Sequence, residues 1–239
     1  MEPRFQTSLG TYYLGDSNLL LDTDLGNSLI GRVQLILTSP PFPLNSKKGY
    51  GNLEGEEYLS WFINLAPLFE KLIKNDGSIV VELGNAWEPG RPVQSLLHLD
   101  ALMGFVKNKE ADLRLCQQFI CYNPSRLPSP AQWVTVNHIR TTDSFTHVWW
   151  IAKSDFPKAD TDKVQRPYSK SMQDLLKKQK YNFGKRPSEH NISEKSFLVD
   201  RGGSISHNLF ELEAMDEDRD PRLPNAFSFS NTKSNDFFQ

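Results

Sequence analysis

Residues 33–42, VQLILTSPPF, decide the fold. The first half of this stretch is apolar and rich in branched side chains, which is typical of a buried β-strand. The strand has to stop at Ser39, because Pro40 and Pro41 carry no N–H group with which to continue a ladder of hydrogen bonds. The stretch therefore predicts a strand over residues 33–37 that leads directly into a rigid, proline-fixed turn.

The residues after this turn predict an α/β sheet with parallel strands. Apolar side chains recur at helical spacing over residues 58–71, where Pro67 should kink or break the helix. Residues 78–84, SIVVELG, form a second apolar strand, and residues 93–107 predict another helix. Because a strand, a helix and a strand follow one another, we expect a doubly wound α/β sheet with parallel neighbours.

The second half of the chain changes in character. Residues 115–122 and 147–152 are apolar and predict two antiparallel strands at the edge of the sheet, joined by a proline- and serine-rich loop over residues 123–133. Beyond residue 157 the sequence is polar, and residues 169–178 form its one short periodic segment. We expect a loop-rich module there.

Charge is distributed unevenly along the chain. The net charge is −2, yet the stretch from Lys163 to Arg201 holds ten lysines and arginines against four acidic residues, a local charge of +6. Such a basic segment is compatible with a module that faces DNA. A solvated and partly disordered loop explains the same composition.

The composition excludes several classes of protein. Cys116 and Cys121 have neither metal-ligand nor disulfide-framework spacing, which favours a reducing compartment, and the five histidines show no metal spacing either. The first ten residues do not resemble a signal peptide, and no apolar run approaches the ~20 residues that span a bilayer. We therefore expect a soluble, cytoplasmic protein without a metal and without a membrane partner.

The turn after the first strand carries the chemistry that we expect. In open α/β sheets, ligands bind beyond the carboxyl ends of the strands. Since the two prolines lack N–H groups, the carbonyls of Ser39 and Pro40 remain as outward acceptors, and Phe42 adds an aromatic face. A flipped cytosine or adenine needs such acceptors for its exocyclic amino group and a ring on which to stack. We therefore assign Ser39, Pro40, Pro41 and Phe42 as the catalytic residues.

The same residues indicate methyl transfer to an amino group rather than to a ring carbon. An exocyclic amine is a weak nucleophile, and acceptors that hold both of its hydrogens stabilise the positive charge that develops during attack on a methyl sulfonium. A ring-carbon methyltransferase would need a Pro-Cys nucleophile, and neither cysteine of this chain follows a proline.

Several ordered stretches resemble one known family. They are VQLILTSPPFPLNSKKGYGN, EEYLSWFINLAPLFEKLIKNDGSIVVELGNAW, YNPSRLPSPAQWV, IRTTDSFTHVWWIAKSDFPKAD, KRPSEHNISEKSF and RGGSISHNL. Together they are similar to the β-class cytosine-N4 DNA methyltransferases of type II restriction–modification systems, and to the PvuII-type enzymes among them. In that family Ser-Pro-Pro-Phe/Tyr is the catalytic motif, which corresponds here to residues 39–42. The related adenine-N6 enzymes more usually have Asp in place of Ser39.

The resemblance also implies a cofactor and a polymeric substrate. The methyl donor would be S-adenosylmethionine and the substrate duplex DNA. Thr38, together with Glu82, Gly84 and Asn85 at the end of the second strand, is expected where cofactor and base meet, so these four are the candidate cofactor-binding residues. Glu82 or Asn85 could orient either ligand, while ordinary strand-end polarity also explains both.

The family's glycine-rich cofactor loop is missing from this sequence. Gly202-Gly203 has neither a strand before it nor a helix after it, so it does not supply that loop. On this basis we expect a Rossmann-like methyltransferase fold whose cofactor half is truncated or carried by a complementing chain. The expected domains are residues 1–156 for the catalytic part, 157–225 for target recognition and 226–239 for the start of the cofactor part.

Basic residues in three places are candidate DNA contacts. Arg126 lies in the proline loop, and the alternative is that this loop is only a rigid surface turn. Lys47 and Lys48 follow the catalytic motif in a glycine-flanked loop, and the alternative there is an ordinary mobile loop without a role in binding. In the basic segment, Arg186 could read a guanine edge in the major groove and the lysines could hold phosphates. The full set of candidates is Lys47, Lys48, Arg126, Lys185, Arg186, His190 and Arg201.

The leading hypothesis from the sequence is therefore a prokaryotic, site-specific DNA methyltransferase that acts on cytosine N4 and protects a restriction site. The alternatives are a cofactor-free DNA-binding remnant, one subunit of a split enzyme, and an adenine-N6 methyltransferase.

Overall fold

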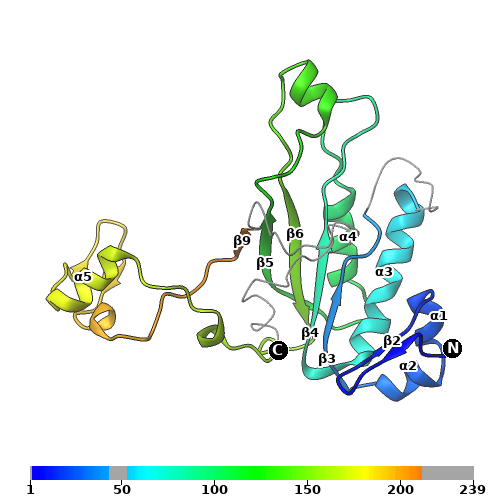
Figure 1. Cartoon of the computed structure of the whole chain (residues 1–239), viewed down its shortest axis with the longest axis horizontal. Helices are drawn as coiled ribbons and strands as arrows, with labels where there is room; N and C mark the ends of the chain where they lie inside the picture. Colours follow the sequence, from blue (N-terminus) through cyan, green and yellow to red (C-terminus); the bar gives the residue numbers. More distant parts are fainter. Residues whose placement is uncertain (1, 43–52, 212–239) are drawn as a thin grey trace. The chain divides into compact units, whose positions relative to one another are not determined.

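The computed structural model describes residues 2–42 and 53–211, which divide into two units (Figure 1). The first unit contains residues 2–42, 53–158 and 209–211, and the second contains residues 159–208. Lys47, Lys48 and the expected cofactor segment 226–239 lie outside the described residues.

A five-stranded sheet forms the first unit. In spatial order its strands are β3 (Val33–Thr38), β4 (Ile73–Leu83), β6 (Phe145–Ala152), β5 (Arg114–Tyr122) and β9 (Leu209–Glu211). Strands β3 and β4 are parallel, β6 runs antiparallel to both β4 and β5, and β9 is parallel to β5. The predicted parallel pair and the predicted antiparallel pair are both confirmed.

Two helices connect these strands, and their apolar side chains pack with those of the sheet to form the core. Helix α3 (Gly55–Leu72) joins β3 to β4, and α4 (Leu97–Val106) joins β4 to β5 (Figure 1). The rings of Phe62 on α3 and Phe105 on α4 lie with their centroids 5.1 Å apart, in one cluster with the buried Trp149 of β6. This mixed sheet with packed helices is the α/β, Rossmann-like fold that the sequence predicts.

Helix α3 continues through Pro67 instead of breaking there. A proline inside a helix leaves the carbonyl four residues earlier without its usual donor. That carbonyl belongs to Ile63, and the side-chain amide Nδ2 of Asn108, two residues past α4, donates to it at 2.9 Å. A side chain from the next loop therefore replaces the hydrogen bond that Pro67 removes.

The expected edge position of strand β6 is wrong. Strand β6 lies in the middle of the described sheet, between β4 and β5. Its residues 148–152 are all buried, with Trp149 1% and Trp150 8% exposed, so both of its faces are covered. An uninterrupted apolar run, as opposed to an alternating one, is the mark of a strand buried on both faces.

The N-terminal residues and the proline loop form smaller elements of this unit. A hairpin of β1 (Phe5–Gln6) and β2 (Thr11–Tyr12) leads to two short helices, α1 (Ser17–Leu21) and α2 (Asp24–Leu29). The side chain of Asp16 caps α1 by accepting from the backbone N–H of Asn18 at 2.9 Å. Between β5 and β6 the loop contains a short π-helix, η1 (Gln132–Val136).

The second unit is built from short pieces. These are the 3₁₀ helix η2 (Thr161–Val164), helix α5 (Lys170–Lys178), the hairpin of β7 (Gly184–Lys185) and β8 (Asn191–Ile192), and the 3₁₀ helix η3 (Ser196–Leu198). The predicted helix over residues 169–178 is confirmed, with Ser169 as its N-cap. A bridge between Arg166 and Ser204 ties the two ends of the unit together. None of the described helices in either unit is long and apolar enough to cross a membrane.

Candidate active site

The sheet topology places the predicted catalytic turn at the end of the sheet where its parallel strands finish. Because β3, β4 and β5 run in the same direction and β6 runs against them, the carboxyl ends of the first three strands meet the start of β6. The register pairs Thr38 with Val81, Leu83 with His147 and Tyr122 with Phe145. We call this end of the sheet the carboxyl edge. It is the place where open α/β sheets bind ligands.

The predicted catalytic residues 39–42 leave the sheet at this edge. Ser39, Pro40 and Phe42 are half-buried and Pro41 is exposed. The ring of Phe42 lies on the backbone at Gly84, just past β4, so closely that a Cβ atom at residue 84 would stand 2.6 Å from both Cδ2 and Cε2 of the ring. Only glycine permits this approach, and the structure therefore joins Phe42 and Gly84 into one site.

Glu82 is the buried carboxylate of the site. It is 6% exposed, and its Oε1 accepts a hydrogen bond of 2.7 Å from the hydroxyl of Thr146 on β6. Burial, followed by the negative charge of Glu82, raises the pKa of the neighbouring Cys121 thiol to about 11. A thiol with such a pKa stays protonated at neutral pH and is a poor nucleophile.

Asn85 belongs to a chain of hydrogen bonds across the carboxyl edge. Its Nδ2 donates to Asp143 Oδ1 at 2.9 Å, and its Oδ1 lies 3.0 Å from Nε2 of His147. The indole Nε1 of Trp87 donates to the other oxygen of Asp143 at 3.4 Å, and Nε2 of Gln118 lies 2.8 Å from Nδ1 of His147. Gln118, Asp143 and His147 were not among the site residues predicted from the sequence. An aspartate just before an apolar strand and a histidine inside it were the only signals available.

A cavity of ≈ 460 Å³ lies beside this chain of hydrogen bonds. Trp87 and Phe145 give it aromatic walls, and Asp143 and Arg140 give it polar ones. The guanidinium of Arg140 donates to the carbonyl of Pro92 from Nε and Nη2, at 3.1 and 2.8 Å. Arg140 is thereby held in the wall of the cavity.

The described DNA-contact candidates are divided between the two units, one in the first and four in the second. In the first unit, Arg126 follows β5 at the carboxyl edge and donates from Nη1 to the carbonyl of Phe145 at 3.1 Å. In the second unit, Lys185, Arg186 and His190 lie together on the exposed β7–β8 hairpin, closed by the backbone bond from Arg186 N to His190 O. Arg201 is exposed elsewhere in the second unit, where its backbone N donates to the hydroxyl of Tyr168.

The fold and the motif together define a member of a methylase family. The profile of the DNA methylase family N6_N4_Mtase matches residues 33–233, which is most of the chain, and the chain belongs to this family. Type II methyltransferase M.PvuII of Proteus hauseri is 41% identical over 213 residues, which cover 88% of this chain and 61% of the relative. The resemblance read from the sequence is therefore confirmed.

A solved structure agrees with this assignment. The fold is similar to that of the PvuII DNA methyltransferase (cytosine-N4-specific), with a TM-score of 0.59 and 34% identity, over 76% of this chain and 67% of the other. The chain spans 61% of the length of the curated relative that it matches.

The four residues expected to hold S-adenosylmethionine fit that role unequally. A buried carboxylate such as Glu82 complements a positively charged sulfonium, and Thr38 ends the neighbouring strand with a half-buried hydroxyl. Gly84 is covered by Phe42, and both ends of the Asn85 amide are engaged inside the protein. On this geometry Thr38 and Glu82 are better candidates for contact with the cofactor than Gly84 and Asn85.

Proposed function

We propose that this protein methylates cytosine N4 in duplex DNA at a specific site, with S-adenosylmethionine as methyl donor. The observation that carries the proposal is the placement of Ser39–Phe42 at the carboxyl edge, with the Phe42 ring seated on Gly84. Membership of the DNA methylase family and the cytosine-N4-specific relative support the choice of reaction and of base.

The protein's part in the reaction is to hold and polarise the target amine. The carbonyls of Ser39 and Pro40 and the Ser39 hydroxyl accept hydrogen bonds from the exocyclic amino group, and Phe42 stacks on the flipped base. The amine then loses conjugation with the ring and its nitrogen lone pair becomes available. The donor supplies an electrophilic methyl group when it is bound, and Thr38 and Glu82 are the described residues placed to hold it.

Two other reactions fit the site less well. Methylation at a ring carbon needs a thiolate nucleophile, and the Cys121 thiol at this edge is buried with a pKa of about 11. Methylation of adenine N6 would use the same turn, but Ser39 stands where that branch more usually has Asp, and the similar solved enzyme is described as specific for cytosine N4.

For target recognition we propose the second unit, with the β7–β8 hairpin as its DNA-reading part. Its exposed Lys185, Arg186 and His190 suit phosphate and base-edge contacts. Arg186→Glu should weaken binding to duplex DNA and reduce the salt dependence of the binding constant, because a phosphate or base contact is lost. Binding measured at several salt concentrations tests this, with Lys109→Glu, at an exposed lysine of the first unit, as a control of equal charge change.

The test of the proposed reaction is direct. The purified 239-residue chain is incubated with unmethylated plasmid DNA and S-adenosylmethionine labelled in the methyl group, and the DNA is digested to nucleosides for mass spectrometry. Label in N4-methylcytosine supports the proposal. Label in N6-methyladenine or 5-methylcytosine overturns it. A chain that binds DNA and leaves it unlabelled overturns the claim that these 239 residues are the transferase.

A further inference from the structure

Five side chains form a continuous hydrogen-bonded chain at the carboxyl edge, outside the proposed catalytic turn. It runs from Gln118 on β5 through His147 on β6 to Asn85, then to Asp143, which also accepts from Trp87. The chain thus links the residues that follow β4 to the neighbouring strands β6 and β5. The active-site chemistry described above uses none of these side-chain groups.

The direction of every bond in this chain is fixed by its ends. Trp87 Nε1 only donates, and the Asp143 carboxylate only accepts. Asn85 must therefore present its Nδ2 to Asp143 and its Oδ1 to His147. His147 then carries its proton on Nε2 and accepts from Gln118 on Nδ1. One arrangement of donors and acceptors satisfies all members at once, so the chain has a single favoured geometry.

This geometry bears on Phe42 through the backbone. Asn85 directly follows Gly84, and the Phe42 ring lies within van der Waals contact of the Gly84 backbone. A side chain held from both ends leaves its backbone little freedom. The position of the Gly84 backbone, and with it the seat of the Phe42 ring, is consequently fixed by the two hydrogen bonds of Asn85.

We propose that Asn85 and Asp143 are positioning residues, which hold Gly84 beneath Phe42 so that the ring is set to stack on the target base. The proposal rests on the proposed function for the role of Phe42. It assigns to Asn85 a task inside the protein in place of cofactor binding.

A reciprocal exchange tests the pair. In Asn85→Asp, two carboxylates face each other. In Asp143→Asn, an amide N–H must face either Trp87 Nε1 or Asn85 Nδ2. The double variant Asn85→Asp/Asp143→Asn restores every bond. The new carboxylate at position 85 accepts one hydrogen bond from His147 and one from the new amide N–H at position 143. The oxygen of that amide accepts from Trp87. Each single variant should lower methyl transfer about 10- to 100-fold, as a small misplacement of a positioned group does, and the double variant should recover most of that loss.

The readout at Phe42 is spectroscopic and needs no methyl transfer. With 4-fluorophenylalanine at position 42, the ¹⁹F resonance should move or broaden in each single variant and return to its original position in the double variant. Asn108→Asp is the matched control, because this half-buried asparagine also makes an interior hydrogen bond, to Ile63, and is not a member of the chain at the carboxyl edge. It should lower the melting temperature and leave the ¹⁹F signal unchanged.

The two hypotheses fail in different ways. Single variants with an unchanged ¹⁹F signal, or a double variant that stays as altered as the singles, overturn the positioning role whatever the enzyme does. If the ¹⁹F signals follow the expected pattern while the unsubstituted protein transfers no methyl group to cytosine N4, the positioning of Phe42 stands and the proposed reaction falls.

Discussion

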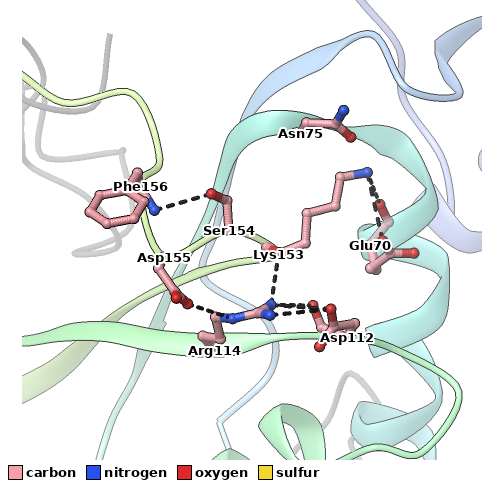
Figure 2. Close-up of a pocket in the computed structure, with 8 residues that line it drawn as sticks. All are labelled: Glu70, Asn75, Asp112, Arg114, Lys153, Ser154, Asp155 and Phe156. Atoms are coloured by element: carbon pink, nitrogen blue, oxygen red, sulfur yellow. Dashed lines mark hydrogen bonds and ion pairs between the residues drawn. The ribbon is translucent and has the colours of Figure 1, made fainter.

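The two ends of the central sheet use polar side chains in opposite ways. At the carboxyl edge, Asn85, His147 and Gln118 form a hydrogen-bonded chain that ends on the one carboxylate of Asp143. At the opposite end, a cavity of ≈ 500 Å³ is lined mostly by charged groups (Figure 2). There Arg114 pairs with Asp155 at 2.6 Å and with Asp112 at 3.3 Å.

The hydrogen bonds at one end and the ion pairs at the other differ in how firmly they hold a side chain in one position. The side chain of Arg114 is 40% exposed and those of its two partners are 70% and 82% exposed, so water competes for every one of these ion pairs. At the carboxyl edge Asn85, Asp143 and His147 are half-buried, and their hydrogen bonds are directional, so removing one of the three leaves another unsatisfied. We infer that the hydrogen bonds at the carboxyl edge hold their side chains in one geometry, whereas the ion pairs of Arg114 at the opposite end do not.

The largest effect should come from the catalytic turn. Ser39→Ala removes an acceptor for the target amine, and the rate of methyl transfer should fall about 100-fold, as when one preorganised hydrogen-bonding group is lost from an active site. Single-turnover rates on a duplex carrying the recognition site measure it. Ser28→Ala, an exposed serine on α2, is the control. Equal rates for the two variants would remove Ser39 from the reaction.

A second strong effect is expected at Gly84. Gly84→Ala places a Cβ atom 2.6 Å from two atoms of the Phe42 ring, so the ring or the strand end has to move. Overpacking of this kind costs about 1–3 kcal/mol of unfolding free energy, and methyl transfer should fall as well. Urea unfolding and activity are both measured, with Gly10→Ala as control, since a Cβ there meets no atom within 4 Å. An unaltered Gly84→Ala protein would show that Phe42 does not rest on this glycine.

Acid should weaken the carboxyl edge through His147. Burial first, and then the nearby His98, lower the pKa of His147 to about 4, whereas an unfolded histidine titrates near 6.5. Between these values the unfolded chain binds more protons than the folded one. The stabilising contribution is therefore complete above about pH 6.5 and is lost as the pH falls toward 4.

The loss between pH 7 and pH 5 should amount to about 1–2 kcal/mol of unfolding free energy. Urea unfolding at both pH values measures it, and His147→Gln should flatten the dependence. His207→Gln, at an exposed histidine of the second unit, should leave it in place. If the two variants have the same pH dependence as the unsubstituted protein, His147 is not the group that responds.

The smallest effect is expected at the opposite end of the sheet. Arg114→Gln breaks the two ion pairs that Arg114 itself makes in Figure 2, with Asp112 and Asp155, and exposed pairs contribute less than about 1 kcal/mol. Unfolding free energy should change by no more than this, less at high salt, and methyl transfer should stay the same. A large fall in the methylation rate would contradict the division of roles between the two ends of the sheet.

Much of the first unit could be predicted from local sequence. The apolar run before Ser39, the period of α3 and the strand before Gly84 are strong local signals, and the structure places them as expected. The central position of β6 was missed because an apolar strand does not reveal its neighbours, although its unbroken apolar run was a usable sign. Likewise, nothing local shows that Asn108 would complete the hydrogen bonding that Pro67 disrupts in α3.

The site was predictable in part for a similar reason. Ser39–Phe42 is contiguous in sequence and could be found by its prolines and its strand. The chain from Gln118 to Trp87 joins residues as far as 62 positions apart, and only the pairing of β4, β5 and β6 brings them together. Asn85 could be recognised as a polar residue at the end of a strand. Its two hydrogen-bond partners are Asp143, just before β6, and His147, within β6, and its sequence position does not reveal them.

The most direct test of the central claim is where the target base lies. Duplex DNA in which 5-iodocytosine replaces cytosine is bound to the protein and irradiated, and the cross-linked peptides are mapped by mass spectrometry. We predict an adduct at Phe42, and its loss in Phe42→Leu, because the proposed function stacks the flipped cytosine on this ring. Adducts confined to Phe156, at the opposite end of the sheet, would contradict it.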